Sequence, residues 1–296
     1  TALVLNQITG RDVSAGLRLH ELQLAGAVDR AGTVILDGDP MVTFRTTDLT
    51  TILGAVSLTT GFRVDEGAVF RYQKRGADVV SGSGTTGPFT TGSTHRTVTS
   101  PKGFLIPVSI SAAQNGIASM VLTYFGYESD DGATRPFVLN TSQGLSSAPA
   151  RNSEFTLGPV TLNDVVLDGL QSWELQSGLN FVTRKKNGRT YPNEGRLISR
   201  LPRLVLKFDN PEIADNVGSY FHSQLANTLK VFARKKSLTT TDGNVADNAS
   251  SHLAITISAG SWKLDDESAN DHDDIPGTVT VMPTGTISSS LSAAIS

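Results

Sequence analysis

The sequence predicts a mainly β protein made of two similar tandem domains, each a sandwich or barrel with one flanking helix. Three observations carry this prediction. Gly, Ser and Thr are abundant and helix-building runs are scarce, a composition that favours strands and loops. Short segments of the first half return in the same order in the second. A length of 296 residues also corresponds to about two domains.

The repeat sets the expected domain boundary. Its matching segments are Gly16–Gln23 with Gly169–Gln176, Val69–Lys74 with Val231–Lys236, and Ile110–Ala112 with Ile257–Ala259. The first pair keeps Gly, Leu, Glu, Leu and Gln in step at an offset of 153 residues. Repeated segments indicate a duplicated structural unit. We therefore predict one domain over residues 1–148 and a second over 149–296.

A long hairpin follows the repeated segment of the second half. Asn187-Gly188 lies between two strand-like runs, which is a strong hairpin signal, so we expect arms at Leu179–Thr183 and Arg189–Ile198. With the offset of 153, this hairpin carries nine residues more than its counterpart in the first half. The first half has the longer loop later, in the Gly- and Ser-rich run Ser81–Thr94.

Each half contains one amphipathic helix. The apolar face in the first half is Leu49, Ile52, Leu53 and Val56, at helical spacing. In the second half, Asn210-Pro211-Glu212 supplies a helix start. The buried stripe expected after it is Ile213, Val217, Tyr220 and Phe221.

Strands are expected around both helices. They are Met41–Arg45, Ala68–Lys74, Phe104–Ala112 and Ala118–Tyr127 in the first half, and Leu204–Phe208, Leu229–Lys235, Leu253–Ala259 and Gly277–Met282 in the second. A small barrel or sandwich with a helix against it would bury this pattern. Ser142–Pro149 is the expected linker, and Thr284–Ser296 is expected to be mobile or docked on a neighbour.

Composition excludes several classes of protein. Without cysteine there is no disulfide or thiolate metal site, and a net charge of −3 is unlike a sequence-reading nucleic-acid binder. No apolar run approaches the length of a membrane-spanning helix, and the start lacks the pattern of a signal peptide. We therefore expect a protein that is made and used without export and without a membrane.

The repeated unit resembles the tail tube domain of long-tailed bacteriophages. The features that carry the resemblance are the long hairpin after the Glu-Leu-Gln strand and the single helix after the strand that starts at a proline. Two such domains in one chain imply a homotrimer whose ring is pseudo-hexameric. Stacked rings would then build the tail of a virion, assembled in the host cytoplasm together with other tail proteins. DNA would pass through the lumen during ejection without specific binding.

Charged loops are the candidate contacts between such rings. The residues are Arg184, Lys185, Lys186 and Arg189 on the basic hairpin tip, and Asp265, Asp266, Asp271 and Asp273 in the acidic segment. Complementary charge would fix the register of stacking. Two plainer interpretations stay open, namely a hairpin turn protected from edge pairing by lysines and a solvated acidic tip. The acidic segment could bind calcium, although it lacks the order of an EF-hand loop.

No enzyme or cofactor is expected. The sequence has no G-x-S-x-G nucleophile elbow and no phosphate-binding G-x-x-x-x-G-K-[ST] loop, and its five histidines form no zinc pattern. The alternative function is a tandem β binding module, such as another tail or baseplate component or an adhesin.

Overall fold

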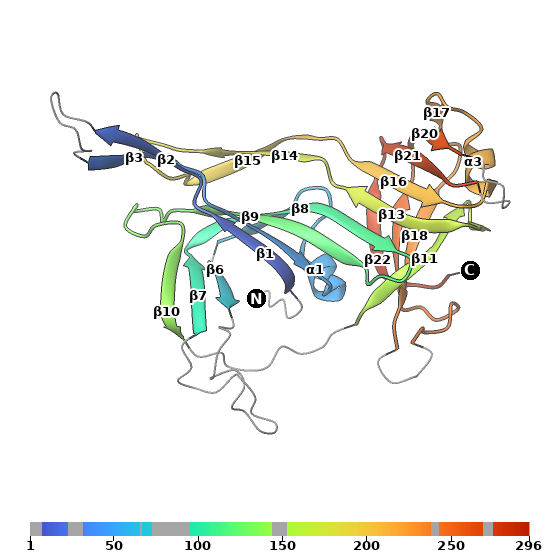
Figure 1. The fold of residues 1–296 in the computed structure, drawn as a ribbon, viewed down its shortest axis with the longest axis horizontal. Coiled ribbons are helices and arrows are strands. Elements are labelled where there is room, and N and C mark those ends of the chain that lie inside the picture. The colour runs from blue at the N-terminus through green and yellow to red at the C-terminus, as the bar shows by residue number, and fades with distance from the viewer. Residues whose placement is uncertain are drawn as a thin grey trace, which may run out of the picture.

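The computed structural model describes residues 8–22, 32–65, 67–72, 95–143, 153–237, 243–268 and 275–295. Within these ranges the chain is mainly β, with antiparallel sheets and two short helices (Figure 1). The mainly β prediction is therefore confirmed. The helices are α1 (Leu49–Ala55) and α3 (Glu212–Val217). The Gly- and Ser-rich loop and most of the expected linker lie outside the described residues.

One ten-stranded antiparallel sheet runs through both halves of the chain. In spatial order its strands are β1 (Ile8–Ser14), β4 (Met41–Thr46), β9 (Ser119–Tyr127), β8 (Lys102–Ala113), β13 (Leu170–Gln176), β16 (Arg203–Phe208), β21 (Gly277–Pro283), β20 (Gly260–Glu267) and β17 (Ser223–Gln224), with β5 (Phe62–Val64) added to β8. The alternation of apolar and polar residues along these strands buries one face of the sheet.

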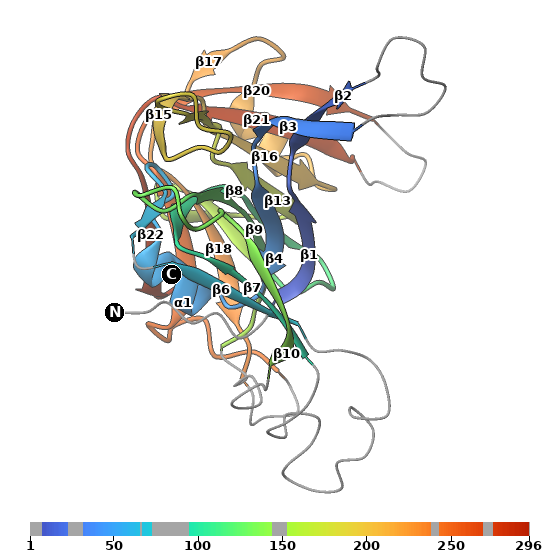
Figure 2. The same ribbon diagram turned by 90° about the vertical axis from the view of Figure 1, so that its left-hand side faces the viewer.

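Smaller sheets accompany each half. A three-stranded sheet contains β10 (Val138–Gln143), β7 (His95–Ser100) and β6 (Ala68–Tyr72), and a five-stranded sheet contains β12 (Val165–Leu167), β11 (Phe155–Leu162), β18 (Leu229–Lys235), β19 (His252–Ile257) and β22 (Ile287–Ala293). Two hairpin arms stand apart, β2 (Leu17–Leu22) with β3 (Gly32–Gly38) and β14 (Leu179–Arg184) with β15 (Glu194–Arg200). Figure 2 shows the large sheet and the smaller sheets from the side.

The two parts of the large sheet share one strand order and one register. Val13 opposite Val42 returns 162 residues later as Leu175 opposite Leu204. Both ladders slip once, between residues 8 and 10 and between residues 170 and 172. The β8–β9 and β20–β21 ladders also slip at matching places, between residues 107 and 109 and between residues 264 and 266. In this part of the sheet, β1-β4-β9-β8 therefore corresponds to β13-β16-β21-β20.

The hairpin arms correct the alignment inferred from the sequence. Leu19 opposite Ile35 returns as Phe181 opposite Leu197, again 162 residues later, so both arms have the same length. The nine extra residues predicted for the second hairpin do not exist. The match at an offset of 153 pairs the arm strand β2 with the sheet strand β13, which have different neighbours. Apolar and polar residues alternate in any half-buried strand, so such a match arises between unrelated strands.

A second repeated segment was also misaligned. Ile110 lies in β8 of the large sheet, whereas Ile257 ends β19 of the five-stranded sheet. The C-terminal expectation was wrong as well, because β22 pairs with β19 of its own chain. The hairpin expected around Asn187-Gly188 is confirmed as β14 and β15, although its second strand begins at Glu194 rather than at Arg189.

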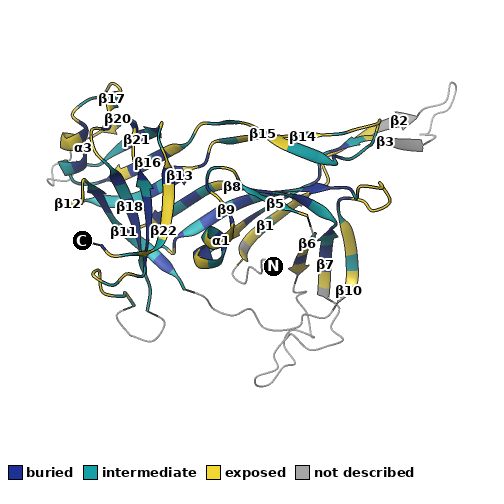
Figure 3. Cartoon of the chain, turned by 180° about the vertical axis from the view of Figure 1, so that it is seen from behind, coloured by how far each residue is buried: buried dark blue, intermediate teal, exposed yellow. Residues whose placement is uncertain are grey.

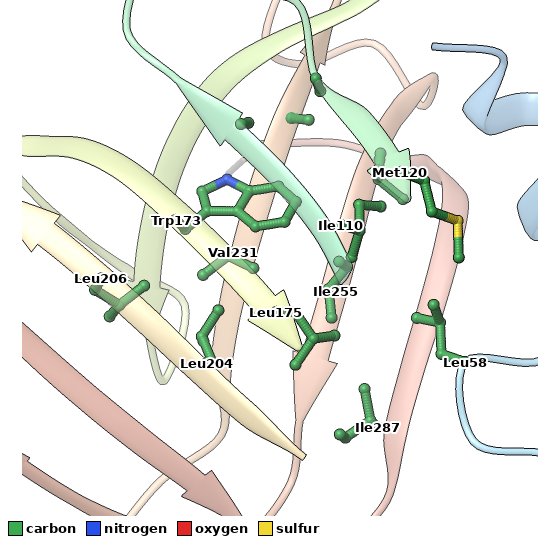
Figure 4. Packing of buried hydrophobic residues seen from close by; sticks show 14 of the residues in the cluster. Leu58, Ile110, Met120, Trp173, Leu175, Leu204, Leu206, Val231, Ile255 and Ile287 are labelled. Carbon is green, nitrogen blue, oxygen red and sulfur yellow. The ribbon is translucent and has the colours of Figure 1, made fainter. Parts of the chain in front are cut away.

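The core is continuous across both halves. Trp173 is buried in it, and its indole N–H donates to the Phe232 carbonyl oxygen at 3.0 Å. Figure 4 shows Leu58 of the first half beside Ile287 of the second, within the same cluster of buried side chains. One closely packed interior therefore joins the two halves.

The helices are shorter than the sequence pattern indicates. Asp48 caps α1 by accepting a hydrogen bond from the Thr51 backbone N–H at 3.2 Å. Helix α3 ends at Gly218, whose φ of 62° is left-handed. Tyr220 and Phe221 therefore lie beyond the helix and are exposed, which corrects their predicted place in the buried stripe.

Candidate protein interface

A single pair of strands joins the two parts of the large sheet. β13 pairs antiparallel with the C-terminal segment of β8, where Glu174 faces Ser111 and Gln176 faces Ser109. The Ser177 N–H extends the contact by donating to the Val108 carbonyl oxygen at 2.9 Å. The N-terminal part of this β8 edge is covered by β5, which pairs with residues 103–105. The join between the halves thus uses the part of the edge that β5 leaves open.

The matching edges at the two ends of the large sheet stay open. In the described part of the chain, β1 pairs only with β4, although its counterpart β13 pairs on both sides. β17 covers residues 261 and 262 of β20, as β5 covers β8, and leaves the edge from Asp266 to Ser268 open in the described residues. Open edges carry backbone N–H and C=O groups that can pair with another chain.

The β14–β15 arm reaches across the first half and packs on it (Figure 1). The Phe181 ring stacks on Phe104 with centroids 4.6 Å apart and lies 5.1 Å from the Phe125 centroid. Further along the arm, the Thr190 carbonyl accepts from the Gly38 N–H at 3.1 Å. Aromatic packing and backbone hydrogen bonds thus fix the arm along its length.

Ion pairs hold the basic tip of this arm to the same half. Arg189 donates to the Glu128 carboxylate at 2.9 Å and to the backbone carbonyls of Ser129 and Asp130. Lys185 contacts Asp37 and lies 3.2 Å from Asp39. Both contacts join the second half of the chain to the first, so they hold the whole arm in place and do not merely stabilise its turn.

The other basic residues of the tip are more exposed. Lys186 pairs with Glu194 within the arm at 2.5 Å, and Arg184 is exposed at the end of β14. Three of the four predicted basic contacts therefore have acidic partners in their own chain. Their role between rings stays a prediction.

The β2–β3 arm has the same register but a different environment. Leu17, Leu19 and Leu36 are exposed apolar side chains on it, and Figure 3 shows the arm at the outer end of the molecule. Phe181, the counterpart of Leu19, is packed against two aromatic rings, whereas Ile198, the counterpart of Leu36, is 53% exposed as well. Exposed apolar side chains grouped on one element are typical of a protein interaction surface.

The four predicted acidic residues lie in different environments or outside the described residues. Asp265 pairs with Lys263 at 2.6 Å and accepts a hydrogen bond from the Thr280 hydroxyl. Burial raises the pKa of Asp265, but the hydrogen bonds from Lys263 and Thr280 lower it by more, so the pKa lies below its usual value. Asp266 is exposed at the open edge of β20. Asp271 and Asp273 lie outside the described residues.

The sequence contained a signal for this interface that the first alignment missed. Pro40 and Pro202 lie 162 residues apart. This offset would have identified β1 and β13 as counterparts. The exposed Tyr220 and Phe221 have no such sequence signal, because their spacing continues the apolar face of the helix.

Comparison with known proteins identifies no relative of this chain. No family model matches the chain, and no curated protein sequence matches it. In the described residues, no group of three or more His, Cys, Asp or Glu side chains is arranged to hold a metal ion. No helix of the described chain is long and apolar enough to cross a membrane.

Proposed function

We propose that the chain is a structural virion protein whose copies join edge to edge into trimeric, pseudo-hexameric rings that stack into a phage tail tube. The observation that carries this proposal is the β8–β13 junction. It joins two sheet units of equal order and register and leaves the same two kinds of edge, β1 and β20, open in the described residues. On this proposal, residues 1–148 and 149–296 are two tandem domains of one duplicated type.

The internal junction gives the register of the contact between chains. Glu174 opposite Ser111 becomes Asp12 opposite Ser268 when each residue is replaced by its counterpart on the open edges. The interface is head-to-tail, because two different edges meet, and such a contact forms a ring when its rotation closes. Closure would remove both open edges. The number three follows from the resemblance, since six units of this type make a ring.

The sheet face away from the core would line the channel. It carries charged side chains of both signs at positions that alternate with the buried ones. Among these are Arg45, Arg203, Lys207, Lys263, Asp12, Glu174, Asp265 and Asp266. A uniformly basic wall would retain DNA, because phosphate contacts dominate its affinity for proteins. A wall of mixed charge is compatible with the passage of DNA.

The free arm would supply a second contact within the ring. The β14–β15 arm packs on the first half of its own chain, so the β2–β3 arm would pack on the second half of the next chain. In that contact Leu19 takes the place of Phe181, and Met282 takes the place of Phe125. Axial stacking of rings is supported by the resemblance rather than by a described contact.

Disulfide trapping tests the proposed edge contact, because the chain has no cysteine. The double variant Asp12→Cys and Ser268→Cys should form a covalently closed trimer on oxidation, with rings visible by negative-stain electron microscopy. Directly opposed residues have Cβ atoms about 4.5–5.5 Å apart, close to the range that a disulfide spans.

Two control variants bracket this result. Glu174→Cys with Ser111→Cys tests the same geometry within one chain and should give an internal disulfide. Asp12→Cys with Glu267→Cys is one residue out of register and should link poorly, because neighbouring side chains point to opposite faces. A chain that remains monomeric and uncrosslinked at high concentration would falsify the ring. Glycan binding by such a monomer would support the alternative of a binding module.

A further inference from the structure

Besides the strand pairing and the β14–β15 arm, the junction between the halves has a third contact. The segment between α1 and β5 reaches the strand β22 of the second half. Leu58 of this segment is only 9% exposed and belongs to the same buried cluster as Ile287. The two residues also line one hollow together with Ser289. The segment around Leu58 thus lies against β22 of the other half of the chain.

The counterpart of this segment in the second half is uncovered. It lies between α3 and β17 and contains Tyr220 and Phe221, which are 60% and 83% exposed. It is attached to the open strand, because the Ser219 carbonyl accepts from the Leu264 N–H at 2.9 Å. The Tyr220 hydroxyl also donates to the Glu267 carboxylate at 2.9 Å. Whatever pairs with β20 therefore meets these two aromatic side chains.

The counterpart of the receiving strand is also exposed. β10 corresponds to β22, since Leu139 faces the buried Val98 as Ser289 faces the buried Ile255 in the matching sheet. Leu139 is 57% exposed in the first half. An apolar side chain thus stands at the position where the internal junction has Ser289.

We propose that Tyr220 and Phe221 pack on β10 of a second copy of this chain, around Leu139, as the outer contact of the ring joint. This inference rests on the proposed ring. The internal junction is the evidence that a second copy of this chain is the partner. The counterpart of the α3–β17 segment already meets the counterpart of β10 once within the chain. Packing of the two aromatic rings there would remove the most exposed aromatic side chain of the described residues from water.

Aspartate substitutions test the contact. Phe221→Asp and Leu139→Asp in the full chain should each raise the concentration needed for ring formation by about tenfold, as expected when one apolar side chain loses its burial. Val138→Asp is the matched control, because Val138 is the preceding residue of β10, is 39% exposed and points to the opposite face. Mass photometry over a concentration series measures the threshold. Circular dichroism and thermal melts should match the parent chain, because the substituted side chains are exposed.

Cross-linking separates this inference from the ring itself. Phe221→Cys with Leu139→Cys should give a disulfide between chains. If Asp12→Cys with Ser268→Cys closes a trimer while this second pair stays reduced and Phe221→Asp leaves the threshold unchanged, the aromatic contact is overturned and the ring stands. If neither pair links two chains, the proposed ring itself fails.

Discussion

At the scale of single residues, glycines fix where each arm leaves the sheet. Gly178 has a φ of 60°, and a Cβ added there would lie 1.9 Å from the Leu201 carbonyl oxygen. Its own carbonyl accepts from the Leu201 N–H at 2.9 Å, so the two backbones cannot move apart without loss of that bond. Gly16 stands in the same place before the first arm, with a φ of 54° and Asp39 as its neighbour. Only glycine fits both positions.

Gly178→Ala should therefore be costly. A left-handed backbone costs a non-glycine residue about 1–2 kcal/mol, and the collision with Leu201 adds to this in the free energy of unfolding. Gly188→Ala is the control, since Gly188 has a φ of 70° but no atom within 4 Å of an added Cβ. Urea unfolding should show a clearly larger loss for Gly178→Ala. Equal losses would mean that the close approach to Leu201 is unimportant.

A buried tyrosine predicts a limit at alkaline pH. Burial raises the pKa of Tyr124 to about 12, although the hydrogen bond to Ser100 at 3.0 Å acts in the other direction. Between pH 10 and 12 the unfolded chain loses this proton while the folded chain keeps it, so stability falls as pH rises. The loss from this group reaches about 2–3 kcal/mol. Tyr124→Phe should flatten the decline of the unfolding free energy above pH 10. An unchanged slope would contradict this assignment.

At the scale of elements, the arm shows how burial decides the value of an ion pair. The side chains of Arg189 and Glu128 are 24% and 7% exposed, and those of Lys186 and Glu194 are 54% and 38% exposed. Loss of one partner from a buried pair leaves an uncompensated charge, whereas exposed pairs contribute little. The two basic residues belong to the same turn region, so they form a natural comparison.

Arg189→Ala should destabilise the chain by about 3 kcal/mol or more. Lys186→Ala should cost less than about 1 kcal/mol. Chemical denaturation gives both values, and Arg189→Ala with Glu128→Gln should recover part of the loss because the buried charge is also removed. A small effect of Arg189→Ala would show that the arm is held mainly by Phe181.

The elements also show which features a sequence can predict. The strands around both helices and the β14–β15 arm follow from local alternation and from Asn187-Gly188, and the structure contains them. The pairing of the halves did not follow, because similar alternating patterns occur in strands with different neighbours. The strand β22 was missed because its serine-rich sequence carries little apolar signal, although it pairs with β19 along most of its length.

The open edges depend on the third dimension entirely. Nothing in the sequence of β1 or β20 distinguishes an edge from an inner strand, and the sheet order is needed to see that their counterparts β13 and β8 are paired. The exposure of Tyr220 and Phe221 also cannot be read from the sequence. Their spacing continues the apolar face of α3, but the helix ends at Gly218. Candidate site residues based on charge alone therefore pointed to Arg189 and Lys185, which already have partners in their own chain.

At the scale of the whole molecule, the charges of the open edges bear on assembly. When the register of the β8–β13 junction is transferred to the open edges β1 and β20, Ser14 lies opposite Asp266 and Asp12 lies opposite Ser268. In this transposed register, Asp12 and Asp266 are diagonal neighbours on one face of the sheet. Diagonal neighbours lie about 7–8 Å apart, within the screening length of about 10 Å at 0.1 M salt. Their repulsion would oppose ring formation at low salt.

Ring formation should therefore strengthen as salt rises. We expect the concentration threshold to fall by several-fold between roughly 0.05 and 0.5 M NaCl, because the Debye length shrinks below the spacing of the two carboxylates. Asp266→Asn should lower the threshold at low salt and reduce its dependence on salt. Asp164→Asn is the matched control, since it removes the same charge from a 64% exposed carboxylate in the β11–β12 turn, away from both edges. A threshold that rises with salt, or equal effects of the two substitutions, would contradict the transposed register, since only that register brings Asp266 beside Asp12.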